Sequence, residues 1–314
     1  MFKKVILFTT LIVFNPIQFT LAAQDFTNIQ SLAILADAAY LEKGVLQTEA
    51  QANQTVTGQT SSPQINNELS LENALQDVRQ KLIYHTTIPE SQVSYFLSQY
   101  NGVQTIAIRG TANLENALLD LNVSLQTDND LNIMLHQGFA SAAKAVYEDV
   151  KPYLDKQQPI QTTGHSLGGA IAVILAMYLE KDNYPLSQVI TFGQPKVTNV
   201  TGAKQFSDLS LIRVVTLNDI VPLVPPISPL QIKDLDIYWH MGEEVILMEN
   251  NEYAQTNGVK SMLRATKFVS AIPSEKNLFA HKMTTYLALI KEQVKSPNEV
   301  PYKTNISLFG ISFD

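Results

Sequence analysis

The chain has 314 residues, of which 45% are hydrophobic and 16% are charged, and it contains no cysteine. This length and apolar content allow a substantial core and exclude a disordered protein. The 22 basic and 29 acidic side chains give a net charge of −7, which argues against nucleic acid as the main partner because phosphate binding needs clustered lysine and arginine. The absence of cysteine excludes disulfides, thiolate metal sites and a cysteine nucleophile.

Residues 1–23 are typical of a secretory signal peptide. Lys3 and Lys4 precede the apolar run Val5–Phe14, and small residues follow at Ala22 and Ala23. A membrane span would need about 20 apolar residues, which is about twice the length of this run. We therefore expect cleavage near residue 23 and a secreted product, extracellular or periplasmic, without a stable membrane span. The mature chain would keep 20 basic and 29 acidic side chains, a net charge of −9.

The first part of the mature chain predicts a helix, a loop and a hairpin. Thr27–Leu41 carries an apolar stripe at helical spacing. Residues 44–67 are rich in Gln, Thr, Asn and Ser, so we expect a long polar surface loop. Val93–Tyr100 and Val103–Arg109 are β-rich runs joined by Asn101–Gly102. This dipeptide is a strong hairpin signal because both turn residues need positive φ.

Helices and strands alternate after the hairpin. The expected elements are a helix at Ser141–Leu154, a strand at Ile160–Thr163, a helix at Leu167–Leu179, strands at Val189–Phe192 and Leu211–Thr216, and a helix at Lys282–Val294. Such alternation predicts an α/β fold with a mostly parallel, buried sheet. Because no repeat or linker interrupts residues 24–314, we interpret them as one domain.

A nucleophile motif lies between the expected strand at Ile160–Thr163 and the helix after it. The five residues from Gly164 to Gly168 read G-H-S-L-G and fit G-x-S-x-G. The strand–turn–helix context predicts a nucleophile elbow that exposes the Ser166 hydroxyl. The Leu167 N–H, at the helix N-terminus, can stabilise a developing oxyanion. The alternative is a glycine-containing turn with an ordinary N-capping serine.

A serine nucleophile needs a base, and on α/β-hydrolase sheets the histidine follows both the serine and the acid. The sequence has five histidines, which are His85, His136, His165, His240 and His281. The first two precede the serine, and the third should point away from it on the tight turn. His240 lies in an extended apolar run, whereas His281 follows the loop Pro273–Phe279 and opens a helix. Both remain open, and either can also be a structural histidine.

Asp219 is the preferred acid. It stands at the end of an apolar strand, in the segment Leu217–Pro222, and ligand chemistry in open parallel sheets lies beyond the carboxyl ends of strands. Asp234 and Asp236 are alternatives, but their charged stretch is expected to face solvent. An aspartate in this role accepts the Nδ1–H of the histidine and stabilises the imidazolium.

Five segments resemble motifs of one enzyme family. They are Ile108–Thr111 (IRGT), His136–Phe139 (HQGF), Thr163–Gly169 (TGHSLGG), Thr191–Pro195 (TFGQP) and Asn218–Pro222 (NDIVP). In order and spacing they resemble the fungal-type class 3 lipase family of the α/β-hydrolase superfamily. The resemblance extends from about Leu32 to Leu289 and implies that fold, a central, mostly parallel sheet flanked by helices. Many fungal members carry disulfides, from which this chain departs.

The resemblance implies a serine hydrolase mechanism on lipid or other ester substrates. Ser166 would be the nucleophile, Asp219 the acid and His281 the base. The backbone N–H groups of Thr111 and Leu167 would form the oxyanion hole, and no metal or organic cofactor is required. Phospholipase A1 and a soluble-substrate, feruloyl-esterase-like carboxylesterase are alternatives on the same scaffold. A non-catalytic lipid-surface binding protein is a further alternative.

The resemblance also assigns expected roles to less conspicuous parts of the chain. His240 would be a supporting histidine in a strand beside the site. Residues 112–121 match the position of the family's lid, and four apolar residues there share one helical face. A lid would make transient contact with a lipid–water interface, whereas an ordinary packed surface helix is the alternative. The tail 296–314 can be an extra packed strand or a membrane-contacting end. The oligomeric state is open.

Overall fold

A computed structural model describes residues 24–41, 70–111, 124–225, 237–256, 261, 274–302, 307–308 and 311–312. The predicted signal peptide, the polar loop at 44–67 and the expected lid at 112–121 lie outside the described residues. Asp234 and Asp236 lie outside them as well.

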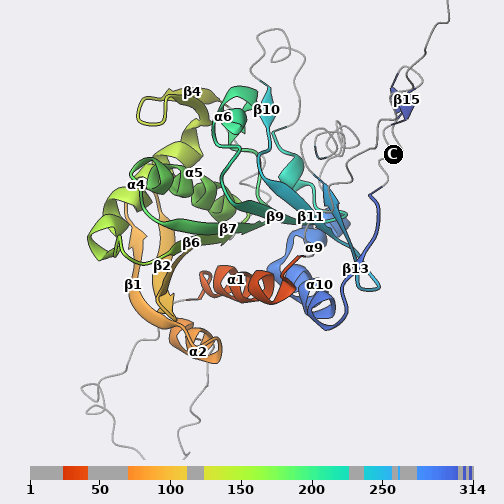
Figure 1. Cartoon of the computed structure of the whole chain (residues 1–314), viewed down its shortest axis with the longest axis horizontal. Coiled ribbons are helices and arrows are strands. Elements are labelled where there is room, and N and C mark those ends of the chain that lie inside the picture. The colour runs from red at the N-terminus through yellow and green to blue at the C-terminus, as the bar shows by residue number, and fades with distance from the viewer. Residues whose placement is uncertain are drawn as a thin grey trace, which may run out of the picture.

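A nine-stranded sheet forms the centre of the described part of the chain (Figure 1). In spatial order its strands are β1 (Lys81–Ile88), β2 (Val93–Tyr100), β3 (Val103–Ile108), β6 (Ile160–His165), β7 (Leu186–Phe192), β9 (Leu211–Thr216), β11 (Glu243–Leu247), β12 (Glu252–Thr256) and β13 (Asn298–Glu299). Every pair from β3 to β11 is parallel, and so is β12–β13, whereas β1–β2, β2–β3 and β11–β12 are antiparallel. The mostly parallel sheet expected from the sequence is confirmed.

Helices cover both faces of this sheet (Figure 1). One face carries α4 (Gln137–Val150) and α5 (Leu167–Lys181), whose apolar side chains join one buried cluster. The other face carries α1 (Phe26–Ala38), α2 (Leu71–Asp77) and α10 (Met283–Lys295), which pack into a second cluster. Because both faces are covered, β7 buries successive apolar residues at Val189 and Ile190, and β9 does so at Val214 and Val215. No helix among the described residues is long and apolar enough to cross a membrane.

Smaller elements complete the described fold. A four-stranded sheet contains β10 (Tyr238–Trp239), β8 (Thr198–Asn199), β5 (Ile133–His136) and β4 (Leu125–Asp128), and α6 (Val200–Gln205) follows β8. Within the tail, β13 extends the main sheet, and β14 (Ser307–Leu308) pairs with β15 (Ile311–Ser312). The β2–β3 hairpin turns at Asn101 and Gly102 with φ of 49° and 76°, as the sequence predicts.

The segment before His281 differs from the expectation. A loop was expected at Pro273–Phe279, but Glu275–His281 form the helix α9, so His281 ends one helix instead of opening the next. Ser274 and Asn277 form a reciprocal capping box that satisfies backbone donors at the start of α9. The expected C-terminal helix follows as α10. His281 therefore sits at a helix–helix junction.

Candidate active site

Ser166 lies on a strained turn between β6 and α5. Its φ is 58° and its ψ is −129°, a conformation that costs free energy for any residue other than glycine. The flanking glycines permit the turn, because a Cβ on Gly164 would lie 2.5 Å from the Gly168 carbonyl carbon. The sequence prediction of a strand–turn–helix at this motif is confirmed. Such a turn lifts the serine above the sheet edge.

Asp219 and His281 form a buried hydrogen-bonded pair. His281 Nδ1 lies 2.8 Å from Asp219 Oδ2, and the side chains are 4% and 0% exposed. The Tyr286 hydroxyl donates to the same oxygen at 2.5 Å, and the Val221 amide donates to Oδ1 at 2.9 Å. Burial alone would raise the pKa of Asp219, but His281, Tyr286 and Val221 together hold it below its usual value. Asp219 is therefore held as an oriented carboxylate.

The segment Thr216–Asn218, which is distant from α9 in the sequence, holds this helix beside the sheet. The Thr216 hydroxyl donates to the Ala280 carbonyl at 2.9 Å, and the Asn277 side chain donates to the Asn218 carbonyl at 2.8 Å. Both contacts lie at the carboxyl end of β9, which also carries Asp219. These bonds satisfy helix-end and loop carbonyls that would otherwise lack partners.

The backbone of Ser166 and the imidazole of His281 both lie against the segment Phe192–Gly193. The Ser166 amide donates to the Phe192 carbonyl at 2.9 Å. The next residue, Gly193, lies against His281, since a Cβ there would be 2.8 Å from the His281 Cε1. Ser166 Oγ and His281 Nε2 are both buried, and neither makes a hydrogen bond within the described part of the chain. Bonds of this kind are often long before substrate binds.

The two expected oxyanion donors flank the serine. Leu167 is the first residue of α5, and the first N–H groups of a helix have no partner within it. The helix dipole adds partial positive charge at the same point. Thr111 follows Gly110, and a Cβ on that glycine would lie 3.2 Å from Ser166 Cβ. Thr111 itself is exposed. Leu167 is thus next to Ser166 in the chain, and the residue before Thr111 is close to it in space.

The other histidines have different partners. The nitrogen Nε2 of His240 lies 2.6 Å from the Pro222 carbonyl, in the segment after Asp219. His136 caps α4, and its Nδ1 accepts from the Phe139 amide at 3.4 Å. His85 lies in the edge strand β1. None of these three is hydrogen-bonded to Asp219 in the described structure.

His165 is the residue near the site that sequence reasoning left without a role. One ring nitrogen, Nδ1, lies 2.8 Å from the Tyr40 hydroxyl, and the other, Nε2, lies 2.7 Å from the backbone carbonyl of His281. Its position before the serine indicates proximity to the site. However, no sequence signal identifies partners that are 125 and 116 residues away.

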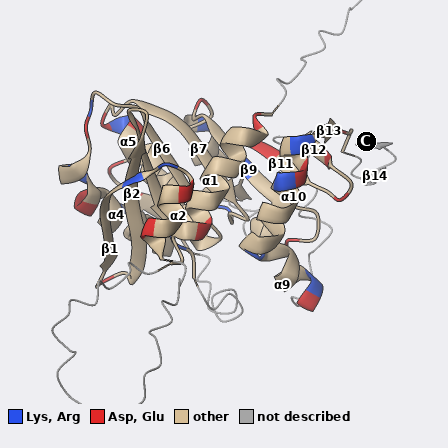
Figure 2. Cartoon of the chain, turned by 90° about the horizontal axis from the view of Figure 1, so that it is seen from below, with Lys and Arg blue, Asp and Glu red and all other residues tan. Residues whose placement is uncertain are grey.

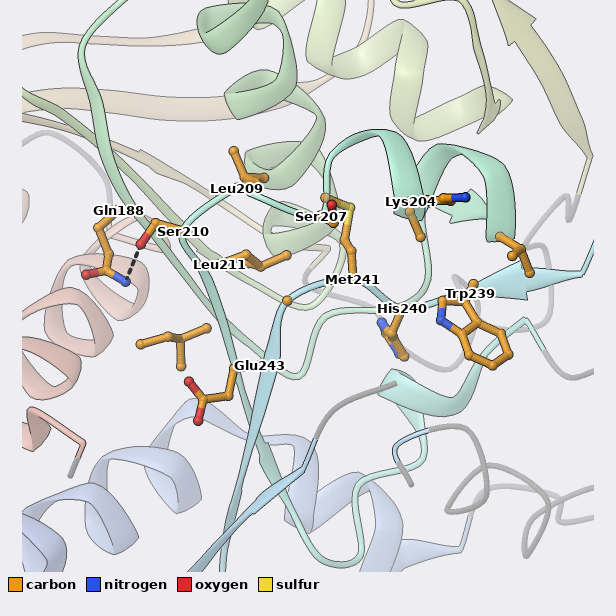
Figure 3. A pocket seen from close by; sticks show the side chains of 14 residues that line it. Gln188, Lys204, Ser207, Leu209, Ser210, Leu211, Trp239, His240, Met241 and Glu243 are labelled. Atoms are coloured by element: carbon orange, nitrogen blue, oxygen red, sulfur yellow. Dashed lines mark hydrogen bonds between the residues drawn. The ribbon is translucent and has the colours of Figure 1, made fainter. Parts of the chain in front are cut away.

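A cavity of about 670 Å³ in the described structure lies at the other end of the sheet (Figure 3). Gln188, Leu211 and Glu243, near the amino ends of three parallel strands, contribute to its wall together with Trp239 and Met241. Ser166, Asp219 and His281 do not line it. The described residues also contain no group of three side chains suited to a metal ion.

Comparison with known proteins finds a family match for part of the chain. Residues 105–228 match the class 3 lipase family. The matched segment contains Thr111, Ser166, Leu167 and Asp219, whereas His281 lies beyond it. Its pairing with Asp219 in the structure is thus independent of the family match.

Curated relatives of this chain are fungal, plant and animal proteins. The secreted mono- and diacylglycerol lipase 1 of Fusarium solani is 32% identical over 138 residues, which cover 39% of this chain and 39% of that protein. A lipase of Rhizopus niveus is 32% identical over 136 residues, which cover 39% of this chain and 35% of that protein. The chain thus spans about two fifths of the length of the curated relatives it matches.

Solved structures show the fold. A lipase from Rhizopus microsporus var. chinensis has a TM-score of 0.55 and 24% identity, covering 71% of this chain and 75% of that one. A mutant MDLA from Penicillium cyclopium has a TM-score of 0.58 and 18% identity, covering 83% of this chain and 96% of that one. The expected α/β-hydrolase fold is confirmed.

Proposed function

We propose that this chain is a class 3 lipase that hydrolyses carboxylic ester bonds of acylglycerols with Ser166 as nucleophile, His281 as base and Asp219 as acid. The observation that carries the proposal is the buried 2.8 Å bond between Asp219 Oδ2 and His281 Nδ1, close to a serine on a strained strand–helix turn. A bond to Nδ1 leaves Nε2 of the imidazole free to accept the proton of a serine hydroxyl.

The first step is acylation. The Ser166 Oγ attacks the ester carbonyl carbon while His281 Nε2 takes the hydroxyl proton. The N–H groups of Leu167 and Thr111 stabilise the oxyanion, each such donor being worth about 3 kcal/mol. The bond to the alcohol oxygen then breaks, and His281 gives its proton to the leaving alcohol. The products are a free alcohol and an acyl ester of Ser166.

The second step is hydrolysis of the acyl-enzyme. Water gives a proton to His281 Nε2 and attacks the acyl carbonyl carbon. When the intermediate collapses, the bond to Ser166 Oγ breaks and the oxygen recovers its proton from His281. Asp219 stabilises the imidazolium in both steps without taking the proton itself. No metal or organic cofactor takes part.

Two relatives support the substrate class and the location. Proteins of Fusarium solani and Penicillium camembertii are named secreted mono- and diacylglycerol lipases. We extend that substrate class to this chain, together with export through the signal-peptide pattern of residues 1–23. Partial glycerides and triacylglycerols are neutral lipids, and a mature chain of net charge −9 has no broad attraction to anionic membranes.

An exposed apolar pair supports contact with a lipid–water interface. Phe279 in α9 and Leu217 after β9 are 62% and 43% exposed. Their neighbours Asn277 and Asn218 are hydrogen-bonded, so the two segments lie together beside the Asp219–His281 pair. Acidic and basic residues lie close together at the outer end of α9 (Figure 2). An apolar rim of this kind fits a neutral lipid surface.

Phospholipase A1 activity is the second candidate. Phospholipase A1-Igamma2 of Arabidopsis thaliana is 29% identical over 166 residues, which cover 44% of this chain and 30% of that protein. The chemistry at the ester would be the same, and only recognition of the head group would differ. The substrate assay below separates the two.

Fatty-acid release from triacylglycerol, diacylglycerol, phosphatidylcholine and a soluble aryl ester tests the proposal. We expect release from acylglycerols and the aryl ester, and a loss on the order of 10⁶-fold in kcat for Ser166→Ala. A serine-reactive fluorophosphonate should label the wild type and not the variant. Faster release from phosphatidylcholine would favour the second candidate, and an unlabelled wild type would overturn the serine mechanism.

The base has its own test. His281→Ala should lower kcat on the aryl ester far more than His240→Ala. A larger loss at His240 would transfer the role of base to that residue. Circular dichroism of both variants separates loss of catalysis from loss of the fold.

A further inference from the structure

A chain of buried polar contacts runs behind the catalytic pair. The Tyr40 hydroxyl is 2.8 Å from His165 Nδ1, and His165 Nε2 is 2.7 Å from the carbonyl oxygen of His281. His165 is 6% exposed and immediately precedes the nucleophile. Tyr40 follows α1, so three distant segments of the chain meet at this imidazole.

Hydrogen-bond chemistry determines which atom donates in each of these two contacts. A backbone carbonyl can only accept, so the Nε2 of His165 carries the hydrogen and donates it to His281. The Nδ1 of a neutral imidazole is then an acceptor, and the Tyr40 hydroxyl donates to it. Burial, together with the charge of His281, lowers the pKa of His165 to about 3. His165 therefore remains neutral and keeps one tautomer.

The contacts of Tyr40 and His165 link two segments that must be aligned for the proposed catalysis, the end of α9 at His281 and the segment Gly110–Thr111. The carbonyl of His281 lies at the C-terminus of α9, where helix carbonyls lack intrahelical partners, and His165 provides one. At the other end, the Tyr40 hydroxyl lies against Gly110, because a Cβ added to that glycine would clash with the hydroxyl oxygen. The next residue is Thr111, an expected oxyanion donor.

We propose that Tyr40 and His165 are positioning residues for ester hydrolysis, holding the backbone of His281 and of Gly110–Thr111 in register with Ser166. This inference rests on the proposed function. It assigns no contact with substrate to either residue. Misplacement of a catalytic group by about 1 Å can cost on the order of 100-fold in rate. A rigid link among these three segments therefore acts on kcat.

The neutral state of His165 is part of the same role. The rings of His165 and His281 are 4.4 Å apart between centroids, with an interplanar angle of 36°. A second imidazolium at that distance would oppose the positive charge that His281 must carry in the transition state. The bond from the Tyr40 hydroxyl needs Nδ1 as an acceptor and therefore selects the neutral form, and burial favours the same form.

Substitutions can remove either the Tyr40–His165 bond alone or both bonds of His165. Tyr40→Phe removes only the hydroxyl, and His165→Leu removes both bonds. His165→Gln places an amide N–H near the position of Nε2 and so restores the donor to the His281 carbonyl. On a soluble aryl ester we expect kcat to fall about 10-fold for Tyr40→Phe and about 100-fold for His165→Leu. His165→Gln should recover most of that loss, and KM should stay within twofold throughout.

Tyr95→Phe is the matched control. The Tyr95 hydroxyl is also buried and donates to Asp149 at 2.5 Å, but it has no contact with the site. It should lose stability like Tyr40→Phe and keep the kcat of the wild type. An equal effect of both variants on stability, with kcat unchanged in both, would overturn the proposal. So would a His165→Gln variant no more active than His165→Leu.

A measurement without substrate separates this inference from the proposed function. In ¹⁵N NMR of labelled protein, His165 should show the neutral Nε2–H tautomer, and Tyr40→Phe should shift the ring signals of His281. Unchanged His281 signals would overturn the link even in an active enzyme. A wild type that hydrolyses no ester would overturn the proposed function, while the NMR result would still decide whether Tyr40 and His165 position His281.

Discussion

His281 Nδ1 lies 2.8 Å from Asp219 Oδ2 across 62 residues of sequence. The carboxylate is held by two further donors, the Tyr286 hydroxyl and the Val221 amide. All three donors act on one buried group, so its orientation is set before any substrate arrives. The imidazole thereby receives both its tautomer and its ring plane from Asp219.

Replacement of Asp219 by asparagine should abolish most of the activity without unfolding the protein. The amide no longer selects the Nδ1–H tautomer, and the expected loss in kcat is on the order of 10⁴-fold. Steady-state kinetics on a soluble aryl ester measure it. Asp149→Asn, which also alters a carboxylate bonded to a buried tyrosine hydroxyl, is the control and should retain kcat within twofold. Similar losses in both variants would contradict the assignment.

Gly193→Ala should damage the site directly. Gly193 has φ of +60°, and a Cβ there would lie 2.8 Å from His281 Cε1 and 2.9 Å from Asp219 Oδ2. We expect kcat to fall by on the order of 100-fold, because the imidazole must move. Gly102→Ala is the matched control, with φ of +76° and nothing within 4 Å of the added Cβ. It should cost about 1 kcal/mol of stability and leave kcat unchanged.

Stability should fall as the pH decreases below about 6.5. Burial lowers the pKa of His136 to about 4 and that of His165 to about 3. In the unfolded chain these histidines bind protons near pH 6.5. Between about pH 4 and pH 6.5 the unfolded chain therefore holds more protons than the folded chain. The free energy of unfolding therefore decreases toward acid pH, by up to about 1.4 kcal/mol per pH unit for each proton. Urea unfolding across this range measures the slope.

His136→Asn isolates one of these contributions. Asparagine is a good N-cap, so its side-chain oxygen can accept the bond that the Phe139 amide donates to His136 Nδ1 at the start of α4. The variant should show a shallower pH slope between about 4 and 6.5 and the wild-type slope above about 7. A slope that matches the wild type at acid pH would mean that His136 is not held neutral.

The exposed pair Phe279 and Leu217 should matter only at a lipid surface. The double variant Phe279→Ser, Leu217→Ser removes apolar area from two side chains that are 62% and 43% exposed. We expect about a tenfold lower rate on an emulsified triacylglycerol, from about 1.4 kcal/mol of lost surface binding. The rate on a dissolved short-chain ester should remain unchanged. Val294→Ser, at an exposed position on α10, is the control, and equal losses on both substrates would refute the role.

The nucleophile elbow could be predicted because its determinants are local. The spacing of Gly164 and Gly168 around Ser166, a short strand before it and an apolar helix after it all lie within a short segment. The hairpin at Asn101–Gly102 is local in the same sense. Turn chemistry and periodicity are properties of neighbouring residues, and the sequence displays them directly.

Elements that depend on distant partners could not be predicted. Strand β11 begins with Glu243 and Glu244, and two adjacent acidic residues are typical of a surface segment. In the structure, however, Glu244 is buried in an ion pair with Arg213. Helix α9 has only seven residues, too few for a clear apolar period. Its capping box, Ser274 with Asn277, is the signal that could have found it. The contact of His165 with Tyr40 depends on the docking of α1 across the sheet.

Trp239, the only tryptophan of the sequence, lines the cavity at the far end of the sheet from His281 (Figure 3). Its fluorescence therefore reports on the region between α6 and the start of β11, at the opposite end of the parallel strands from the proposed nucleophile Ser166. Unfolding of that region can be followed through the emission of this single side chain. A tryptophan introduced near α9 would add a second, separable signal for events at the site.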